Sequence, residues 1–249
     1  MSNPTILLVQ GSFQTPQVYS SLVSNLQSLG YPTVHPALPS CTDTDHEDFP
    51  TRTLTDDARA VTRVLEELIE NESKTVLVVM HSYGGIVGSE AVPESLSFAH
   101  RQKQGQKGGV VHLFYFAAFV LDVGESVLGK FGESPNNLPD GRFRILNGAK
   151  TLYNDLPEVE AELWESRLIP QSYAVQTTAV TRAACEYIPS TYLVCENDAA
   201  VPAQFQEMFA GMAKAQEIQR CSAGHSPMLS QTRMLVDRIV GVVNKVSEL

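Results

Sequence analysis

The segment Lys-Thr-Val-Leu-Val-Val-Met-His-Ser-Tyr-Gly-Gly, residues 74–85, constrains the fold of this chain more than any other. Its apolar run from Val76 to Val79 ends at His-Ser-Tyr-Gly-Gly, and a helical pattern follows at once over 86–92. A strand, a sharp turn with a central serine and a helix form the layout of a nucleophile elbow, which lifts the serine hydroxyl clear of a sheet. The free N–H groups and dipole of the following helix favour negative charge nearby. Ser82 is therefore a candidate nucleophile.

The turn departs from the usual Gly-x-Ser-x-Gly form, because Met80 occupies the first small position. An unbranched methionine adapts to an irregular space, and Gly84 and Gly85 still supply small residues after the serine. His81 is expected to point away from the site and to pack or hydrogen-bond locally. The alternative interpretation is a strand–turn–helix of some other α/β fold, in which Ser82 only caps the helix.

Continuous apolar runs alternate with amphipathic segments along most of the chain. Such runs predict strands that are buried on both faces, and the segments between them have helical spacing. The predicted strands are 5–9, 31–37, 76–79, 110–120, 191–195 and 216–220, and the predicted helices are 16–29, 54–69, 86–92, 204–212 and 227–246. This order is typical of the α/β class, with a mostly parallel sheet of about six strands flanked by helices.

Residues 123–188 fit this alternation badly. Glycine and proline recur between 124 and 148, and helical spacing returns only over 159–168 and 173–184. An insertion between two sheet strands, placed after the elbow, is where a cap over an active site would lie. The sequence therefore predicts a core formed by 1–122 and 189–249 and a helical cap formed by 123–188.

Composition and charge narrow the classes of partner. The 249 residues are 43% hydrophobic, which is enough for a sizeable core, and the net charge is −10. Nucleic acids and anionic membranes both require basic surfaces, so neither is expected as a partner. A small neutral or apolar substrate molecule fits better. A homodimer is compatible with the sequence, which does not fix the oligomeric state.

Targeting and metal signals are weak. The first residues lack a basic segment followed by an apolar one, and no apolar run reaches 18 residues, so neither a secretion signal nor a membrane span is predicted. The expected location is cytoplasmic. The cysteines lack C-x-x-C spacing and are interpreted as reduced thiols: Cys41, Cys185, Cys195 and Cys221. The acidic run over 43–48 is interpreted as a solvated loop, and no metal site is predicted.

A serine hydroxyl needs a base to remove its proton and an acid to orient that base. His225 follows a short predicted strand, at the edge where parallel sheets open onto a ligand crevice. Asp198 follows the strand 191–195 in the same way, and Glu196 is the fallback for the acid. The order Ser82, Asp198, His225 differs from that of other serine-triad folds. The alternatives are a loop histidine that serves packing and an Asx turn at Asp198.

A developing oxyanion needs two backbone donors. The first is expected from Tyr83, which follows the nucleophile, and the second from Ser12, with Phe13 as second choice. Gly11 lets the backbone turn close to the site and is expected to lie against the substrate. Aromatic residues of the cap are candidates for lining the pocket, although packing within the cap is the alternative for each: Phe131, Tyr153, Trp164 and Tyr173.

Three segments resemble the small methylesterase and hydroxynitrile-lyase branch of the α/β-hydrolase superfamily. They are the elbow at 80–85, Phe-Ala-Ala-Phe-Val-Leu-Asp at 116–122 and Gly-His-Ser-Pro-Met-Leu-Ser at 224–230. The resemblance extends over nearly the full chain. It implies an α/β-hydrolase fold whose first strand is the one at 5–9, a helical cap and no cofactor.

Two departures from that branch bear on the chemistry. The family usually carries His-Gly in the first loop, where this chain has Gln10 and Gly11; glutamine still hydrogen-bonds, so the loop geometry is expected to survive. Hydroxynitrile lyases of the branch carry a lysine soon after the catalytic histidine, and the segment 226–228 is Ser-Pro-Met. The resemblance therefore implies ester hydrolysis in preference to cyanohydrin cleavage.

The sequence predicts a serine hydrolase that cleaves a small, largely apolar carboxylic ester or lactone through an acyl-enzyme. Ser82 would attack the carbonyl, His225 would take the proton and Asp198 would hold the imidazole tautomer. Two alternatives stay open. The same fold can serve a C–C lyase, a decarboxylase or a cyclase, which Met80 and Gln10 keep open, or it can serve as a receptor that binds a small ligand without turnover.

Overall fold

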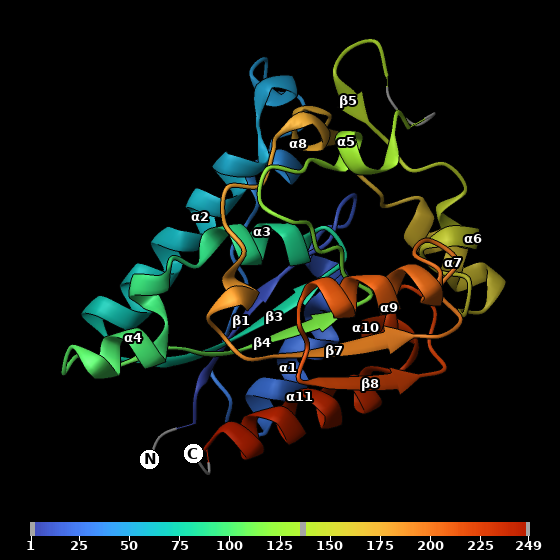
Figure 1. Ribbon diagram of the computed structural model, residues 1–249. Helices are drawn as coiled ribbons and strands as arrows, with labels where there is room; N and C mark the ends of the chain where they lie inside the picture. Colours follow the sequence, from blue (N-terminus) through green and yellow to red (C-terminus); the bar gives the residue numbers. More distant parts are fainter. Residues whose placement is uncertain (1–2, 135–137, 248–249) are drawn as a thin grey trace.

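The computed structural model describes residues 3–134 and 138–247, and a six-stranded sheet forms its centre (Figure 1). The strands are β1 (Thr5–Val9), β2 (Thr33–Val34), β3 (Thr75–His81), β4 (Gly109–Phe116), β7 (Ser190–Cys195) and β8 (Glu217–Cys221). Their spatial order is β2-β1-β3-β4-β7-β8, and each neighbouring pair is parallel. The predicted parallel sheet of about six strands is confirmed.

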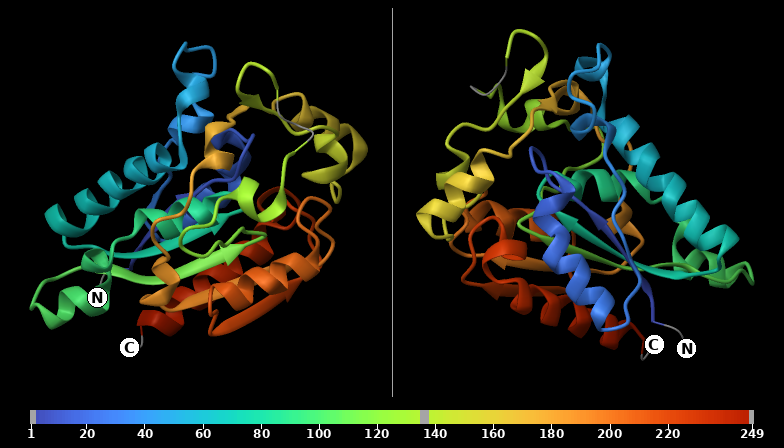
Figure 2. Two further views of the ribbon diagram at one scale, coloured as in Figure 1. Left: turned by 45° about the horizontal axis from the view of Figure 1, so that its top comes forward. Right: turned by 180° about the vertical axis from the view of Figure 1, so that it is seen from behind.

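Helices cover both faces of the sheet. Helices α1 (Ser20–Ser28) and α11 (Thr232–Ser247) lie side by side on one face, as Figure 2 shows from behind. The other face is covered by α2 (Leu54–Glu66), α3 (Gly84–Ala91) and α9 (Ala203–Met212). A further helix, α4 (Phe98–Lys103), precedes β4. None of the helices in the described ranges has the length and apolar character that crossing a membrane requires.

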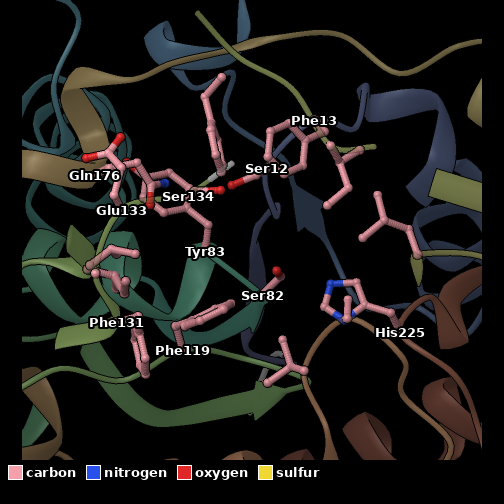
Figure 3. Close-up of a pocket in the computed structure, with 18 residues that line it drawn as sticks. Ser12, Phe13, Ser82, Tyr83, Phe119, Phe131, Glu133, Ser134, Gln176 and His225 are labelled. Carbon is pink, nitrogen blue, oxygen red and sulfur yellow. The ribbon is translucent and has the colours of Figure 1, made fainter. Parts of the chain in front are cut away.

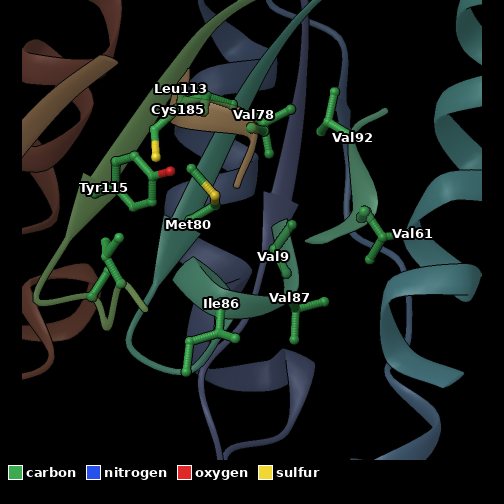
Figure 4. Close-up of a cluster of buried hydrophobic side chains, with 14 of the residues drawn as sticks. Val9, Val61, Val78, Met80, Ile86, Val87, Val92, Leu113, Tyr115 and Cys185 are labelled. Atoms are coloured by element: carbon green, nitrogen blue, oxygen red, sulfur yellow. The ribbon is translucent and has the colours of Figure 1, made fainter. Parts of the chain in front are cut away.

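Alternation along each strand explains why both faces are buried. In β1, Ile6 and Leu8 pack with α1 and α11, whereas Leu7 and Val9 pack with α2 and α3. Figure 4 shows the hydrophobic cluster on the face covered by α2 and α3, in which Val9 lies near residues of β3, α2 and α3. Because helices lie on both sides, the central strands are apolar at most positions, whereas the edge strand β8 keeps polar side chains such as Glu217 and Arg220.

Several predicted boundaries were wrong. The strand predicted over 31–37 pairs only at Thr33–Val34, because proline on either side of it supplies no N–H to the ladder. The strand predicted over 110–120 ends at Phe116, since the next residue, Ala117, has φ +47°. The helices predicted over 16–29 and 54–69 are α-helical only in part: the 3-10 turn η1 (Pro16–Tyr19) precedes α1, and the π-helical turn η4 (Glu67–Asn71) follows α2.

The C-terminal helix is also divided. The helix predicted over 227–246 consists of α10 (Pro227–Ser230) and α11, with Gln231 between them. The remaining turns of the core are the 3-10 segments η2 (Pro39–Cys41), η3 (Phe49–Thr51) and η5 (Glu94–Leu96). Sequence periodicity locates helices but does not distinguish an α-helix from these tighter or wider turns.

The segment predicted as the cap is made of short elements. They are α5 (Val127–Phe131), α6 (Gly148–Thr151), α7 (Glu158–Glu165), α8 (Ala174–Thr177), η6 (Ala184–Glu186) and the antiparallel pair β5 (Arg142–Phe143) and β6 (Gln171–Ser172). The helix predicted over 173–184 was wrong beyond residue 177, where the chain is extended as far as η6.

Hydrogen bonds join this segment to the carboxyl end of the sheet. Asn154 Nδ2 donates to the carbonyl of Asn197, which follows β7, at 2.8 Å. The N–H of Gly224, which follows β8, donates to Asp155 Oδ2 at 2.6 Å. The segment therefore lies over the loops that carry the predicted acid and base. The division into a core and a cap at 123–188 stays a prediction.

Candidate active site

Ser82 occupies the tight turn between β3 and α3. Its φ of +52° lies in the left-handed region, which strains a residue with a side chain. The turn is held by two hydrogen bonds to the Ser82 carbonyl, from the N–H of Gly85 and from the N–H of Phe119, both at 3.0 Å. This is the predicted strand–turn–helix arrangement, and it faces the Ser82 side chain toward a cavity (Figure 3).

The elbow requires glycine for close packing. A Cβ on Gly84 would overlap the carbonyl oxygen of Val9 and lie 2.6 Å from that of Gln10. A Cβ on Gly11 would lie 2.9 Å from the Cβ of Ser82. Helix α3 therefore starts in direct contact with the loop that follows β1, so the loop and the elbow can both face one substrate.

Met80 is accommodated by a glycine that the sequence analysis did not consider. Its side chain is buried, and its thioether lies where a Cβ on Gly88 would be (Figure 4). The space that Met80 needs is thus available because residue 88, one turn into α3, is a glycine. The departure from Gly-x-Ser-x-Gly leaves the turn geometry in place. The available signal was a glycine inside a short helical pattern, which often marks close packing.

The predicted base and acid are paired. His225 Nδ1 lies 2.8 Å from Asp198 Oδ2, and both side chains are buried. Asp198 Oδ1 accepts the N–H groups of Ala200 and Val201, each at 2.8 Å. Because an ionised carboxylate only accepts, Nδ1 of His225 carries the proton of this hydrogen bond, and Nε2 is left able to take a proton.

Gln206, which was not predicted from the sequence, completes the surroundings of the acid. Its Nε2 donates to Asp198 Oδ2 at 3.1 Å and to the carbonyls of Cys195 and Val201. Its Oε1 accepts the N–H of Cys195 at 2.9 Å. No sequence signal singles out this glutamine. By contrast Glu196, the fallback acid, is exposed and lies 3.7 Å from Arg220 Nη1, away from His225.

A cavity of about 270 Å³ lies between the sheet edge and the cap segment. Ser82 and His225 both line it, and Figure 3 shows the serine hydroxyl facing the imidazole ring. The Ser82 hydroxyl makes no hydrogen bond to another described residue, a loose geometry that is common before a substrate binds. The walls are mostly apolar, with phenylalanine the commonest side chain: Phe13, Phe119, Phe131 and Phe143.

The predicted oxyanion donors reach the same cavity. Ser12, Phe13 and Tyr83 all line it. Phe13 has φ +67°, its carbonyl accepts the N–H of Ile169 at 2.9 Å, and its backbone hydrogen-bonds the buried thiol of Cys41. The N–H groups of Ser12 and Tyr83 donate to no other residue among those described. These two N–H groups are therefore the better placed donors for a substrate oxygen.

The other residues predicted to contact substrate are placed differently from one another. Phe131 lines the cavity, but Tyr153, Trp164 and Tyr173 are not among the residues that line it. Tyr153 is fully buried, Trp164 packs against the cluster that contains Tyr153, and the Arg167 guanidinium lies over the Trp164 ring. Gly11 is also outside the lining; its N–H donates to the hydroxyl of Tyr19 at 2.9 Å, behind the nucleophile.

His81 connects segments that are distant in sequence, so the expectation of local contacts was wrong. Its Nδ1 lies 2.7 Å from the Tyr19 hydroxyl and its Nε2 lies 2.9 Å from the carbonyl of His225. Since a carbonyl only accepts, Nε2 of His81 carries the proton of the hydrogen bond to His225. Burial lowers the pKa of His81 well below its usual value, which keeps the ring neutral. His81 thus ties the elbow to the loop of the candidate base.

The first loop keeps its shape through its two glutamines. Gln10 Nε2 donates to the carbonyl of Gln14 at 2.7 Å, inside the protein. Gln14 Nε2 donates to the hydroxyls of Tyr153 and Ser226, and Gln14 Oε1 accepts the Tyr19 hydroxyl. Gln10 stands where the family usually has histidine, and its side chain makes a hydrogen bond within the loop, as expected.

Asp57 is a buried carboxylate beside the site that the sequence analysis did not identify. It accepts the N–H of Ser40 at 2.8 Å, the Ser40 hydroxyl at 2.6 Å and the Tyr83 hydroxyl at 2.8 Å. Burial raises its pKa to about 6. A signal was present, because Asp57 falls on the apolar stripe of its helix with Leu54, Val61 and Leu65. Through Tyr83 it braces one of the two better placed oxyanion donors.

Asp57→Asn is expected to remove a pH dependence of stability. Because the folded pKa is about 6 and the ordinary value is 3.8, the folded protein binds this proton more tightly, and stability falls as pH rises from about 4 to 6. The difference corresponds to roughly 3 kcal/mol. The free energy of unfolding in urea should therefore be measured at pH 4 and at pH 7 for both proteins. From pH 4 to pH 7 the wild type should lose up to that amount relative to Asp57→Asn.

Asp56→Asn is the matched control for this prediction. Asp56 is the next residue toward the N-terminus, and hydrogen bonds from Thr53 lower its pKa below the ordinary value of 3.8, so the stability that its carboxylate contributes is lost mainly below about pH 4. Its substitution should therefore shift stability by nearly the same amount at pH 4 and pH 7. Equal shifts for Asp57→Asn as well would contradict the raised pKa.

The cysteines are free thiols and all are buried. Cys195 and Cys221 face each other across β7 and β8, with their sulfurs 3.7 Å apart. Within the described ranges, no group of three histidine, cysteine, aspartate or glutamate residues is arranged to hold a metal ion. The acidic loop is exposed where His46 and Arg52 meet Asp48.

Comparisons with known proteins agree with this architecture. Residues 6–238 match the model of the alpha/beta hydrolase family. The chain is 33% identical over 258 residues to the alpha/beta hydrolase nvfD of Aspergillus novofumigatus (strain IBT 16806), and the match covers 100% of both proteins.

Solved structures show the same arrangement of elements. Polyneuridine aldehyde esterase aligns with a TM-score of 0.73 at 16% identity, over 97% of this chain and 99% of that one. Tomato methylketone synthase I, in complex with 2-tridecanone, aligns with a TM-score of 0.74 at 16% identity, over 99% and 100%. At these identities the likeness is one of fold.

Proposed function

The chain belongs to the alpha/beta hydrolase family, and from this membership and the geometry of its cavity we propose that it is a serine hydrolase of a small, largely apolar carboxylic ester or lactone. Membership confirms the fold class that the resemblance implied. The observation that carries the proposal is that Ser82 and His225 line one cavity while Asp198 is hydrogen-bonded to the far side of the imidazole.

The proposed reaction starts with attack of Ser82 Oγ on the substrate carbonyl. His225 Nε2 takes the serine proton, and Asp198 stabilises the imidazolium that forms. The N–H groups of Ser12 and Tyr83 stabilise the oxyanion of the tetrahedral intermediate. When the intermediate collapses, the alkoxide leaves with the proton from His225, and a water activated by the same imidazole then releases the acid from Ser82. No step requires a cofactor.

The lining of the cavity supports the substrate class. A volume of about 270 Å³ suits a small molecule, and the aromatic walls favour an apolar one. The net charge of −10 gives a negatively charged substrate no long-range attraction. An esterase is among the solved proteins that share the fold, which supports ester chemistry. A methylketone synthase shares it too, so product identification must accompany any activity assay.

Labelling with a fluorophosphonate tests the proposal directly. The reagent should form an adduct on Ser82 of the wild-type protein, because only an activated serine reacts quickly. Ser82→Ala should abolish the adduct, and His225→Ala should slow its formation by at least about 10³-fold. Intact-protein and peptide mass spectrometry measure both effects.

Ser12→Ala is the matched control for labelling. Its side chain lines the same cavity, but its proposed role belongs to its backbone N–H, so the rate of adduct formation should change little. An adduct on Ser12, or none on the folded wild-type protein, would contradict the proposal. Hydrolysis of a panel of nitrophenyl esters and lactones, with the products identified, then distinguishes hydrolysis from lyase or cyclase chemistry.

A further inference from the structure

Gln176 places an unpaired amide in the wall of the apolar cavity. It lies in α8 of the cap segment, lines the cavity and is only 9% exposed. Its backbone N–H donates to the carbonyl of Tyr173, but its side chain makes no hydrogen bond to any described residue. The amide faces the cavity, and a ligand that covers it without a hydrogen bond would lose about 1–3 kcal/mol, so the cavity favours a ligand that pairs with it.

A carboxylate, that of the exposed residue Glu133, lies at the same end of the cavity. Glu133 also lines it, and its Oε1 accepts the Tyr173 hydroxyl at 2.5 Å. Figure 3 shows Gln176 and Glu133 on the side of the cavity opposite His225. The cap segment thus presents an amide and a carboxylate together, away from the reacting serine.

Apolar side chains separate this polar end from the candidate catalytic residues. Phe119 and Phe131 stack edge to face at 5.9 Å, and Ile86 and Val127 also line the cavity. A ligand that reaches from Ser82 to Gln176 must therefore have an apolar body. The apolar walls offer this body no hydrogen bonds, so only the far end of the ligand can hydrogen-bond to the cap segment.

The chemistry of the polar end selects among the groups that a substrate could carry. An amide both donates and accepts, whereas a carboxylate only accepts. A hydroxyl can donate to Glu133 or to Gln176 Oε1 while it accepts from Gln176 Nε2. A ketone would offer no proton to Gln176 Oε1, an alkyl end would leave the amide unpaired, and a substrate carboxylate would be repelled by Glu133.

We propose that Gln176 and Glu133 form a recognition site for a hydroxyl group, so that the substrate is an apolar ester or lactone with a hydroxyl remote from the reacting carbonyl. This inference rests on the proposed ester hydrolysis at Ser82. Gln176 is a specificity residue in this scheme, and the reacting atoms are handled by Ser82 and His225.

A matched series of chromogenic esters tests the inference. The series contains nitrophenyl hexanoate, octanoate and decanoate, and the same esters with a terminal hydroxyl on the acyl chain. At the chain length that reaches Gln176, the wild type should hydrolyse the hydroxylated ester with a kcat/KM about tenfold or more above that of the plain ester. Gln176→Leu should bring this ratio close to one. Gln204→Leu, an exposed glutamine on α9, should leave it unchanged.

The outcomes separate this inference from the function on which it rests. A ratio near one at every chain length in the wild type, or a ratio that Gln176→Leu leaves intact, would overturn it while fluorophosphonate labelling of Ser82 still supported hydrolysis. Failure of Ser82 to label would instead overturn the proposed function. If Gln176→Leu does not fold, Tyr173→Phe removes the hydroxyl that holds Glu133 and should lower the ratio several-fold; no change would count against the site.

Discussion

Asp198→Asn is expected to lower kcat/KM for ester hydrolysis by roughly 10³- to 10⁴-fold, the loss found when the acid of a serine triad becomes an amide. The geometry fixes which way the new amide points. Two backbone N–H groups, of Ala200 and Val201, face Oδ1, whereas besides the imidazole only the side-chain N–H of Gln206 donates to Oδ2, so the amide oxygen takes the Oδ1 position. The NH₂ group then faces His225 Nδ1 and forces the proton onto Nε2, where it blocks proton transfer from Ser82.

Steady-state kinetics on a nitrophenyl ester measure this loss, and the unfolding curve checks that the fold survives. Glu196→Gln is the matched control, because Glu196 is two residues away, exposed and close to Arg220. Its activity should stay within about twofold of the wild type, the usual range for an exposed ion pair of little energetic weight. A large loss in Glu196→Gln with little loss in Asp198→Asn would exchange the roles of the two acids.

Gly84→Ala is expected to destabilise the protein by about 3 kcal/mol or more and to remove activity. The new Cβ would overlap the carbonyl oxygen of Val9 and approach that of Gln10 at 2.6 Å. Both are backbone atoms at the end of a central strand, so they cannot rotate away as a side chain can. The elbow and the first loop must then separate, which moves Ser82 away from the Ser12 N–H. Urea unfolding and the labelling rate of Ser82 measure the two effects.

Gly88→Ala, on the same helix, separates this effect from the general consequences of adding a methyl group. Its Cβ would meet the side chain of Met80, which is flexible, so a loss of about 1–2 kcal/mol is expected. Met80→Ala in the same chain should recover part of that loss, because it opens the space that the new methyl group enters. Equal destabilisation by Gly84→Ala and Gly88→Ala would contradict the close backbone contact at Gly84.

Much of the candidate site could be predicted from local sequence patterns. The strand and helix on either side of Ser82 could be predicted because a run of apolar residues and a helical repeat need only their own spacing to be recognised. Asp198 and His225 could be located for the same reason: each follows a strand, and parallel strands bring their carboxyl ends to one edge. Phe131 was predicted to line the cavity and does, whereas Tyr153 and Trp164 pack in hydrophobic clusters that join the cap segment to the rest of the protein.

The sequence by itself thus determined the sheet, the elbow and the order of the candidate nucleophile, acid and base, since each depends on patterns within a few neighbouring residues. Only the tertiary structure decided the surroundings: Asp57 beneath Tyr83, Gln206 behind Asp198, Gly88 beside Met80 and the unpaired Gln176. Each of these depends on a contact between segments far apart in the chain. Gly88 and Asp57 are unusual at their positions in the sequence, but the sequence does not show which residues they contact, and the two glutamines carry no local signal until folding places them.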